Sequence, residues 1–422
     1  MRVRLFCSIL LAVFVVFCIL AGSVCYAAEP IRIAVPTALK SDYGYDAAHA
    51  VEFGVKEINA KGGVLVGGER RPIELIKVDT RDMDPGTPIH DALLAVEKVI
   101  LQKKPDAIMV GFGRSEALMA GMDLIAKHKI PYVGAYAQTH KFQVQFAKDP
   151  EKYKYMFRVC TDAIVVAKAL KASLDVLKND YGLNRVYIMP QDTLLSKAFM
   201  GVLRKHCQKT GWEEMGYEVI ASDCTDFSSV LTKMKERKAQ VICTMWDVAQ
   251  GATIFFKQWA SMRVPSLILG HIVGVSSPRA WKIIGPDVEY AIQTEGSMGS
   301  SVPLKKVPKA KDFVERFTKE YGLTRSQWLI GSAYDGVHVL AQAIERAGSL
   351  EADKIVTELE KTDYKGVSGR IRFDKTHQCV FGTDPNETAV CFSYQWQKGK
   401  CVPIHPPSIA EGKVLLPPWM KK

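Results

Sequence analysis

Residues 106–129, DAIMVGFGRSEALMAGMDLIAKHK, decide the fold class of this 422-residue chain. They begin with a short apolar run, turn through residues 111–115 and continue with the apolar spacing of a helix. Parallel strands need such a crossover connection, so a strand followed by a tight turn and a helix is the repeating unit of a parallel sheet. The stretch therefore predicts an α/β domain in which this unit recurs.

The alternation of strand and helix runs along the chain twice. The first array has apolar runs at 31–36, 73–79, 106–110 and 129–135, with helical spacing between them; the second has strands at 184–190, 217–222, 240–246 and 266–270, with helices at 197–209, 227–237 and 249–261. A helix at 332–347 and a β-rich tail follow. Continuous apolar runs are typical of parallel strands covered on both faces. We therefore predict two doubly wound parallel-sheet lobes joined by hinge strands, with a small-molecule cleft between them.

The turn at 111–115 could in principle hold a dinucleotide phosphate. Glu116 stands where the third glycine of that fingerprint belongs, and no ribose-binding acid follows the next strand. A helix that begins near Ser115 can instead bind one small anion, such as a carboxylate, through its free N–H groups. The alternative is that Ser115 only caps its helix.

The N-terminus has the pattern of a secretory signal peptide. Arg2 and Arg4 precede an apolar run at 5–20, and small residues follow up to Ala27 and Ala28. We predict that residues 1–27 are a signal peptide, cleaved near Ala27 or Ala28, and that the mature protein is periplasmic.

Charge and motifs narrow the remaining function classes. The net charge of +11 is scattered, without a basic stripe interleaved with aromatics, so we expect no nucleic-acid partner. No G-x-S-x-G or H-E-x-x-H motif is present, and no C-x-x-C or H-x-x-x-H spacing. We therefore expect neither an enzyme nor a metal or other cofactor.

Seven cysteines follow the predicted signal peptide, and an exported chain meets an oxidising compartment. Some of them should therefore pair, with Cys379, Cys391 and Cys401 as the best candidates because they lie close in sequence. Cys243 lies in the apolar run VICTM and is predicted to be a buried thiol.

The order of elements resembles the substrate-binding proteins of branched-chain amino acid ABC transporters, which have the type I periplasmic binding fold. The resemblance spans the chain after the signal peptide and is carried by segments 31–63, 110–139, 155–162, 225–242, 255–258 and 332–348. INAKGG (58–63), FRVCTD (157–162) and AYDGVHVLAQAIERAG (333–348) are the most specific of these. It implies lobe 1 from 28–156 and 295–390, lobe 2 from 157–294 and 391–422, and hinges near 155–158, 293–295 and Cys391.

The resemblance also implies a carboxylate site on lobe 1. Ser115 matches the family serine that holds the ligand carboxylate at the helix start. Residues in two further loops match cleft positions and complete the implied site: Tyr43, Gly44, Tyr136, Ala137 and Gln138. Arg114 could pair with the carboxylate, or could be a solvated surface arginine.

Lobe 2 departs from the family pattern. Leu194 stands at the position of a cleft tyrosine, and Ile272 stands where the family has the acid that binds the α-ammonium. A buried ammonium without a carboxylate costs several kcal/mol. Trp246 could offer a stacking surface and, with Leu194 and Ile272, form an apolar wall; alternatively, Asp247 could supply the missing acid.

We therefore expect a monomeric solute-binding protein that delivers a small ligand to an ABC permease. The ligand should carry a carboxylate and an aromatic or aliphatic body rather than be a standard branched-chain amino acid. Two alternatives stay open: a sensor that docks on a membrane receptor, and an amino acid binder that uses Asp247. His271 and Gln191 could add hydrogen bonds to the ligand.

Overall fold

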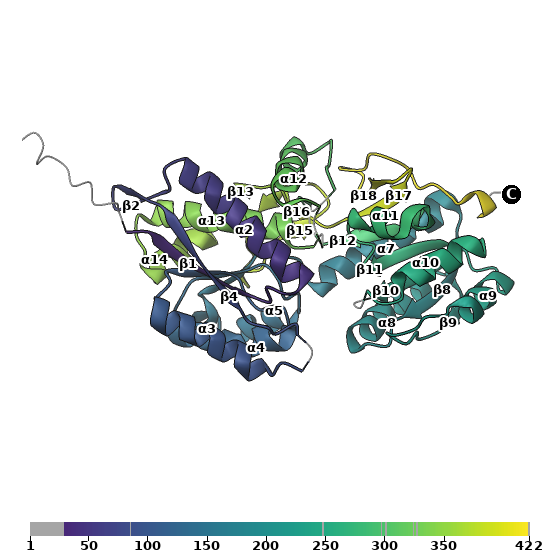
Figure 1. Ribbon diagram of the computed structural model, residues 1–422, viewed down its shortest axis with the longest axis horizontal. Coiled ribbons are helices and arrows are strands. Elements are labelled where there is room, and N and C mark those ends of the chain that lie inside the picture. Colours follow the sequence, from purple (N-terminus) through teal and green to yellow (C-terminus); the bar gives the residue numbers. More distant parts are fainter. Residues whose placement is uncertain are drawn as a thin grey trace, which may run out of the picture.

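Two α/β lobes lie side by side in the computed structural model, as Figure 1 shows. The structure describes residues 29–84, 86–246, 249–296, 298–299, 302–323, 325 and 328–420. The predicted signal peptide and Asp247 lie outside these residues. In the described part, no helix combines the length and the apolar character that crossing a membrane requires.

The first lobe is built on a five-stranded parallel sheet with the order β4-β1-β5-β6-β7. Its strands are β1 (Ile31–Thr37), β4 (Ile73–Asp79), β5 (Ala107–Val110), β6 (Tyr132–Gly134) and β7 (Met156–Arg158). Helices α2 (Asp42–Ala60) and α13 (Ile330–Ala347) pack together on one face, while α3 (Ile89–Lys103) and α4 (Ser115–His128) cover the other (Figure 1). Because both faces are covered, β5 and β6 are buried along their whole length.

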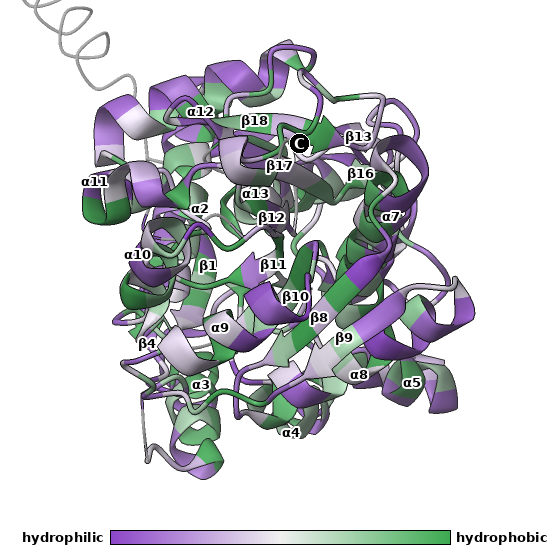
Figure 2. Cartoon of the chain, turned by 90° about the vertical axis from the view of Figure 1, so that its right-hand side faces the viewer, coloured by the Kyte–Doolittle hydropathy of each residue, from purple (hydrophilic) through white to green (hydrophobic). Residues whose placement is uncertain are grey.

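The second lobe is built on a seven-stranded sheet with the order β18-β17-β12-β11-β10-β8-β9. Its strands are β8 (Arg185–Pro190), β9 (Glu213–Tyr217), β10 (Val241–Trp246), β11 (Leu267–Ile272), β12 (Ile292–Glu295), β17 (Phe392–Gln397) and β18 (Lys400–His405). Figure 2 shows the apolar strands β8 and β10 inside more polar helices. Covering helices include α7 (Ala163–Tyr181), α8 (Leu194–Lys209), α9 (Ser228–Glu236) and α10 (Ala252–Ser261).

The remaining helices and strands are shorter or lie outside the two main sheets and the helices named above. They are β2 (Val64–Val66), β3 (Glu69–Arg71), α5 (Lys141–Lys148), α6 (Pro150–Tyr153), α11 (Arg279–Ile284), η1 (Gly285–Val288), α12 (Pro308–Tyr321), α14 (Ala352–Glu360), β13 (Tyr364–Lys365), β14 (Arg370–Ile371), β15 (Phe381–Gly382), β16 (Ala389–Val390) and η2 (Pro418–Met420).

Two features of the second sheet differ from the sequence-based prediction. β17 and β18 are antiparallel to their neighbours, so the sheet is mixed rather than purely parallel. Lys398 and Gly399 both have positive φ, which is the geometry of a two-residue hairpin turn between these strands. The strand predicted at 217–222 lies instead at Glu213–Tyr217, because this half-exposed edge strand lacks a continuous apolar run.

The chain passes between the two sheets after β7, after β12 and before β17. At the second passage Glu295 is fully buried, and neither oxygen of its carboxyl group has a hydrogen-bond partner among the described residues. Burial raises its pKa well above the ordinary value. The predicted lobe boundaries stay a prediction, since sheet membership does not define where the chain would bend.

The predicted disulfides are wrong, because all seven cysteines in the described part are free thiols. Two of the three candidates have different surroundings: Cys379 lies beside β7 in the first lobe, whereas the Cys391 thiol donates to the Glu295 carbonyl, 2.8 Å away. The predicted buried thiol of Cys243 is confirmed, since its side chain is fully buried in β10.

Candidate functional site

A cavity of about 330 Å³ lies between the lobes, at the carboxyl ends of the parallel strands. The first lobe lines it with Tyr43, Met83, Gly113, Ser115, Tyr136, Gln138, Thr139 and His140, and the second with Ala163, Val166, Leu195, Phe199, Met245, His271 and Val273. Trp328 and Leu329, from the segment before α13, complete the lining. Its volume is at the small end of the range for ligand pockets.

Ser115 begins α4 and faces this cavity. Arg114 occupies the N-cap position, and no side chain caps the helix, so Ser115 does not serve as the cap. The hydroxyl and the first N–H groups of α4 thus lie at the positive end of a helix dipole. This wall of the cavity can bind an anion.

Asp82 fixes the loop that leads into α4. Its Oδ2 accepts hydrogen bonds from the N–H groups of Gly113 and Arg114, both at 2.8 Å, and its Oδ1 accepts one from the Thr80 hydroxyl at 2.6 Å. Because this buried carboxylate occupies the two N–H groups, donors for a bound anion must come from Ser115 onward or from the neighbouring loop.

Tyr136 closes the first-lobe wall beside Tyr43. Its hydroxyl lies 2.7 Å from the Ser41 Oγ, and the rings of Tyr43 and Tyr136 are 6.2 Å apart. Burial raises the pKa of Tyr136, so the phenol remains neutral and can donate a hydrogen bond.

The second-lobe wall is apolar, but residues adjacent to the predicted ones form it. Leu194 is 87% exposed and lies outside the cavity, whereas its helix neighbour Leu195 lines it. Trp246 is buried between Phe227 and Phe255, with ring centroids 5.6 and 5.2 Å away.

The physical reason is the alternation of side chains along a strand, which places successive residues on opposite faces. Met245 lines the cavity, whereas Trp246 points into the helix layer. In the same way His271 and Val273 line it, and the intervening Ile272 is buried on the other face. The stacking role predicted for Trp246 and the wall predicted from Leu194 and Ile272 are therefore corrected.

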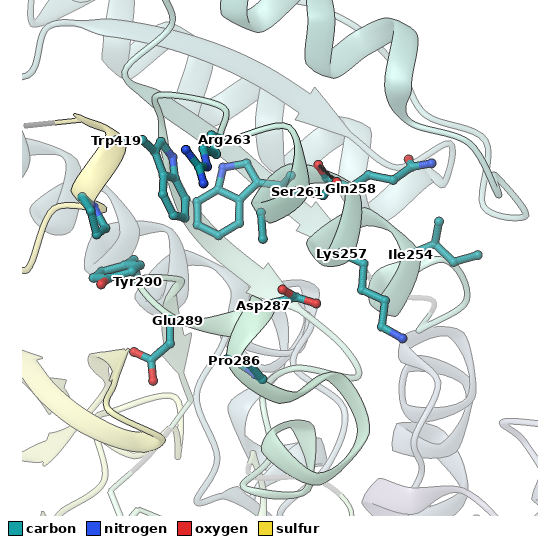
Figure 3. Close-up of a pocket in the computed structure, with 13 residues that line it drawn as sticks. Ile254, Lys257, Gln258, Ser261, Arg263, Pro286, Asp287, Glu289, Tyr290 and Trp419 are labelled. Atoms are coloured by element: carbon teal, nitrogen blue, oxygen red, sulfur yellow. Dashed lines mark hydrogen bonds between the residues drawn. The ribbon is translucent and has the colours of Figure 1, made fainter.

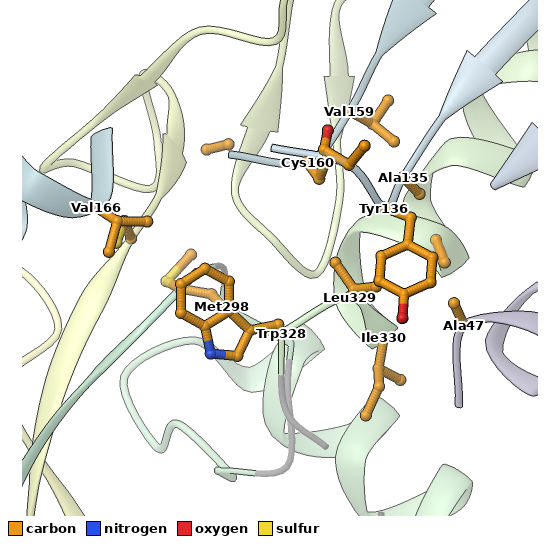
Figure 4. Close-up of a cluster of buried hydrophobic side chains, with 14 of the residues drawn as sticks. Ala47, Ala135, Tyr136, Val159, Cys160, Val166, Met298, Trp328, Leu329 and Ile330 are labelled. Atoms are coloured by element: carbon orange, nitrogen blue, oxygen red, sulfur yellow. The ribbon is translucent and has the colours of Figure 1, made fainter. Parts of the chain in front are cut away.

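His271 and Trp328 join the two lobes across the cavity. The indole Nε1–H of Trp328 donates to His271 Nδ1 at 3.0 Å, and the two rings meet edge to face at 4.2 Å. Burial lowers the pKa of His271 to about 3, so the imidazole is neutral at physiological pH. Figure 4 shows the Trp328 indole between Val166 and Leu329, beside Met298.

Other predicted residues lie near the cavity without lining it. A Cβ on Gly44 would lie 2.2 Å from the Ala38 carbonyl oxygen, so this glycine permits close backbone packing. Arg114 donates to the Thr87 carbonyl at 3.3 Å, and Ala137 is buried in its loop. Gln191 is buried and does not line the cavity. Asp247 lies outside the described residues.

Five predicted residues thus come together at the cavity: Tyr43, Ser115, Tyr136, Gln138 and His271. Sequence reasoning missed the lining residues Met83, Thr139, His140, Phe199 and Trp328, among others. The alternation of β10 and β11 could have indicated Met245 and Val273. No local pattern singled out Trp328, which reaches the cavity through tertiary packing.

A larger hollow of about 800 Å³ lies on the second lobe alone, between α10, η1 and η2. Figure 3 shows Trp419 and Tyr290 on one side of it and Lys257 on the other. The Trp419 indole donates to the Val264 carbonyl at 2.8 Å, and Glu289 accepts from the N–H groups of Lys398 and Gly399. These groups hold the C-terminal segment and the β17–β18 turn in place.

Within the described residues, no three His, Cys, Asp or Glu side chains gather as metal ligands would. Two doubly wound lobes with a cavity at their shared strand ends define a two-lobed solute-binding protein. Residues 30–384 match the model of the periplasmic binding protein family, and the chain belongs to this family. Its members are exported substrate-binding proteins of ABC transporters, which bind small molecules and work with membrane permeases.

Known proteins similar to this chain support the resemblance drawn from the sequence. The Leu/Ile/Val-binding protein homolog 7 of Brucella suis biovar 1 (strain 1330) is 25% identical over 393 residues, which cover 90% of this chain and 91% of the relative. The structure of a putative branched-chain amino acid ABC transporter from Silicibacter pomeroyi has a TM-score of 0.78 at 20% identity and covers 93% of this chain and 100% of its own. The likeness confirms the two-lobed type I periplasmic binding fold.

A further solved structure is a solute-binding protein of an ABC transporter from R. palustris in complex with benzoate. It has a TM-score of 0.66 at 16% identity and covers 89% of this chain and 96% of its own. This likeness, too, is one of fold.

Proposed function

We propose that this protein binds a small carboxylate with an uncharged apolar body, preferably aromatic, and delivers it to an ABC permease. The observation that carries the proposal is the contrast between the two walls of the cavity. The first-lobe wall has the start of α4 at Ser115 and the polar residues 138–140, whereas the second-lobe wall consists of aliphatic, thioether and aromatic side chains around a neutral imidazole.

The same contrast disfavours an α-amino acid. An ammonium group in the cavity would need a carboxylate partner, and none of the seventeen described lining residues is Asp or Glu. His271 cannot replace the acid, because its neutral ring already accepts a hydrogen bond from Trp328. An amino acid ligand would therefore depend on Asp247, the alternative that the experiment below includes.

The aromatic preference rests on the lining side chains. Tyr43, Phe199 and Trp328 offer ring surfaces, and Met83 and Met245 offer thioethers, which make favourable contacts with aromatic rings. The benzoate complex of the structurally similar R. palustris protein agrees with this class of ligand, although that likeness is one of fold.

Family membership and the signal peptide predicted at residues 1–27 support the transport role. We propose cleavage near Ala27 or Ala28, action as a monomer without a cofactor, and no catalysis. Delivery to a permease is favoured over presentation to a sensory receptor because the family consists of transport proteins. Capture of the purified protein by its own permease, but by no receptor, would support this choice.

The ligand class is tested by isothermal titration with benzoate, substituted benzoates, short aliphatic carboxylates and leucine, isoleucine and valine. We expect a carboxylate to bind and the three amino acids not to bind. Ser115→Ala should weaken binding of the carboxylate while leaving the melting temperature of the free protein unchanged. Binding of an amino acid that Asp247→Asn abolishes would favour the alternative.

Two adjacent leucines of α8 provide a matched control. Leu195→Ala removes a side chain that lines the cavity and should weaken binding of the carboxylate, whereas Leu194→Ala changes a residue that is 87% exposed and should leave affinity unchanged. Equal effects of the two variants would contradict this cavity as the ligand site.

A further inference from the structure

Arg158, at the end of β7, is a buried cation with neutral hydrogen-bond partners only. It is 1% exposed, and its Nη1 donates to the carbonyls of Thr139 and Ala137 at 2.7 and 3.2 Å. Nε donates to Gln378 Oε1 at 2.5 Å, and Nη2 donates to Gln143 Oε1 at 2.9 Å. No ion pair between this guanidinium and a carboxylate occurs in the described part of the chain, so its positive charge lacks a direct counter-charge.

The two carbonyl contacts determine which way the loop at 137–140 presents its N–H groups. In a planar trans peptide, the C=O of one residue and the N–H of the next point in opposite directions. With the Ala137 and Thr139 carbonyls directed at Arg158, the N–H groups of Gln138 and His140 point away from it. Gln138 and His140 both line the cavity.

These N–H groups are available to a ligand. No backbone hydrogen bond from Gln138 or His140 N–H to another described residue is present, whereas the N–H of Ala137 donates to the Phe112 carbonyl at 3.1 Å. Asp82 already occupies the N–H groups of Gly113 and Arg114 on the adjacent loop. The Asp82 carboxylate thus accepts hydrogen bonds from N–H groups of the loop that leads into α4, whereas Arg158 donates hydrogen bonds to carbonyl groups of the loop at 137–140.

The far side of the loop is anchored to the second lobe. Gln143 Nε2 donates to Asp162 Oδ2 at 2.5 Å, and His140 Nδ1 lies 3.1 Å from the same oxygen. Asp162 Oδ1 also accepts from the Val165 N–H and caps α7. Gln143 therefore lies between the guanidinium and the carboxylate, keeping the two charges apart instead of letting them neutralise each other.

We propose that Arg158 is a positioning residue of the ligand site, an inference that rests on the proposed carboxylate-binding function. It does not line the cavity. It orients the peptides at 137–138 and 139–140 so that their N–H groups face the ligand, and its unneutralised charge favours an anion there. Both effects make the cavity select a carboxylate over an uncharged ligand of the same shape.

The first test needs no ligand. Crystal structures of Arg158→Lys and Arg158→Met are compared with that of the unchanged protein. A lysine retains the charge but not the planar fork, so we expect at least one of the two peptides to rotate in both variants, turning a carbonyl toward the cavity. Unchanged peptide orientations in both would overturn the positioning role. This comparison is informative even if benzoate proves not to be a ligand.

The second test uses benzoate and benzamide, which have the same shape and differ in charge. The ratio of their affinities should fall by about tenfold or more in Arg158→Met, and by less in Arg158→Lys, which retains the charge. A merely structural arginine would weaken both ligands in parallel, and an unchanged ratio would overturn the selectivity role. If the Met variant fails to fold, the Lys variant still distinguishes a changed ratio from an unchanged one. Failure of the unchanged protein to bind any carboxylate would instead contradict the proposed function.

Discussion

Glu295→Gln should stabilise the protein increasingly, relative to the unchanged protein, as the pH rises, although it changes a fully buried residue at the end of β12. The Glu295 carboxyl has no hydrogen-bond partner among the described residues, and burial alone raises its pKa. Cys391, Tyr394 and Cys401 interact electrostatically with Glu295, and none of them carries a positive charge.

The magnitude follows from proton linkage. The pKa of Glu295 is raised in the folded protein above the unfolded-state value of about 4.3, so the folded state retains its proton longer. Stability therefore falls as the pH rises from about 4 toward the folded-state pKa. Each pH unit within that window costs about 1.4 kcal/mol. The glutamine variant lacks this loss, while its unpaired amide adds a pH-independent cost of about 1–3 kcal/mol.

The assay is urea denaturation of both proteins at several pH values between 4.5 and 8, with unfolding monitored by circular dichroism. The informative quantity is how the difference in free energy of unfolding changes with pH, because the amide cost cancels from it. We expect the variant to gain about 1.4 kcal/mol relative to the unchanged protein for each pH unit between the unfolded-state and folded-state pKa of Glu295. Glu151→Gln is a matched control, since the Glu151 side chain is 91% exposed.

A pH-independent difference between the two proteins would refute the reasoning. It would mean that Glu295 titrates alike in the folded and unfolded states. A change of the same size in Glu151→Gln would show that the pH dependence comes from net charge instead of the buried carboxyl.

Two further predictions concern a residue packed against the cavity wall and a residue in the core of the second lobe. Gly296→Ala places a Cβ 2.9 Å from Trp328 Cε3, so it should displace the indole, weaken ligand binding and shift tryptophan fluorescence. Unchanged fluorescence and affinity would contradict this prediction. Trp246→Phe should lower the free energy of unfolding by about 1–3 kcal/mol and leave ligand affinity unchanged, because Trp246 lies in the core of the second lobe. A loss of ligand affinity in titration calorimetry without a loss of stability would show instead that Trp246 contacts the ligand.

The sequence was sufficient for most of the fold, because buried parallel strands are continuous apolar runs and their helices have a distinct period. β10 and β11 illustrate this, since each is buried throughout and lies where its apolar run predicts. β9 was misplaced because an exposed edge strand has no such run. The antiparallel pairing of β17 with β12 depends on contacts between segments far apart in sequence, which periodicity does not report.

The candidate site likewise contains some residues that the sequence could predict and others that it could not. Ser115 could be predicted because a helix start depends on local sequence, and the structure places it at the cavity. The second-lobe wall could not be predicted to the residue, since a shift of one position along a strand exchanges its two faces. The sequence therefore indicates Trp246 in place of Met245 and Ile272 in place of Val273, whereas His271 is predicted and does line the cavity. Arg158 acts through backbone carbonyls, which no motif identifies.

The return of the chain to the second sheet constrains the order in which the protein can assemble. β12 lies in the interior of that sheet, and its outer neighbour β17 is contributed by residues near the end of the chain. During synthesis from the N-terminus, the edge of β12 that pairs with β17 therefore has no partner strand until the nearly one hundred residues between these two strands have been synthesised. An unpaired edge is a template for association with other chains. Truncation just before β17 should consequently produce aggregation. The segment from α7 to β12, expressed without β17 and β18, should not fold.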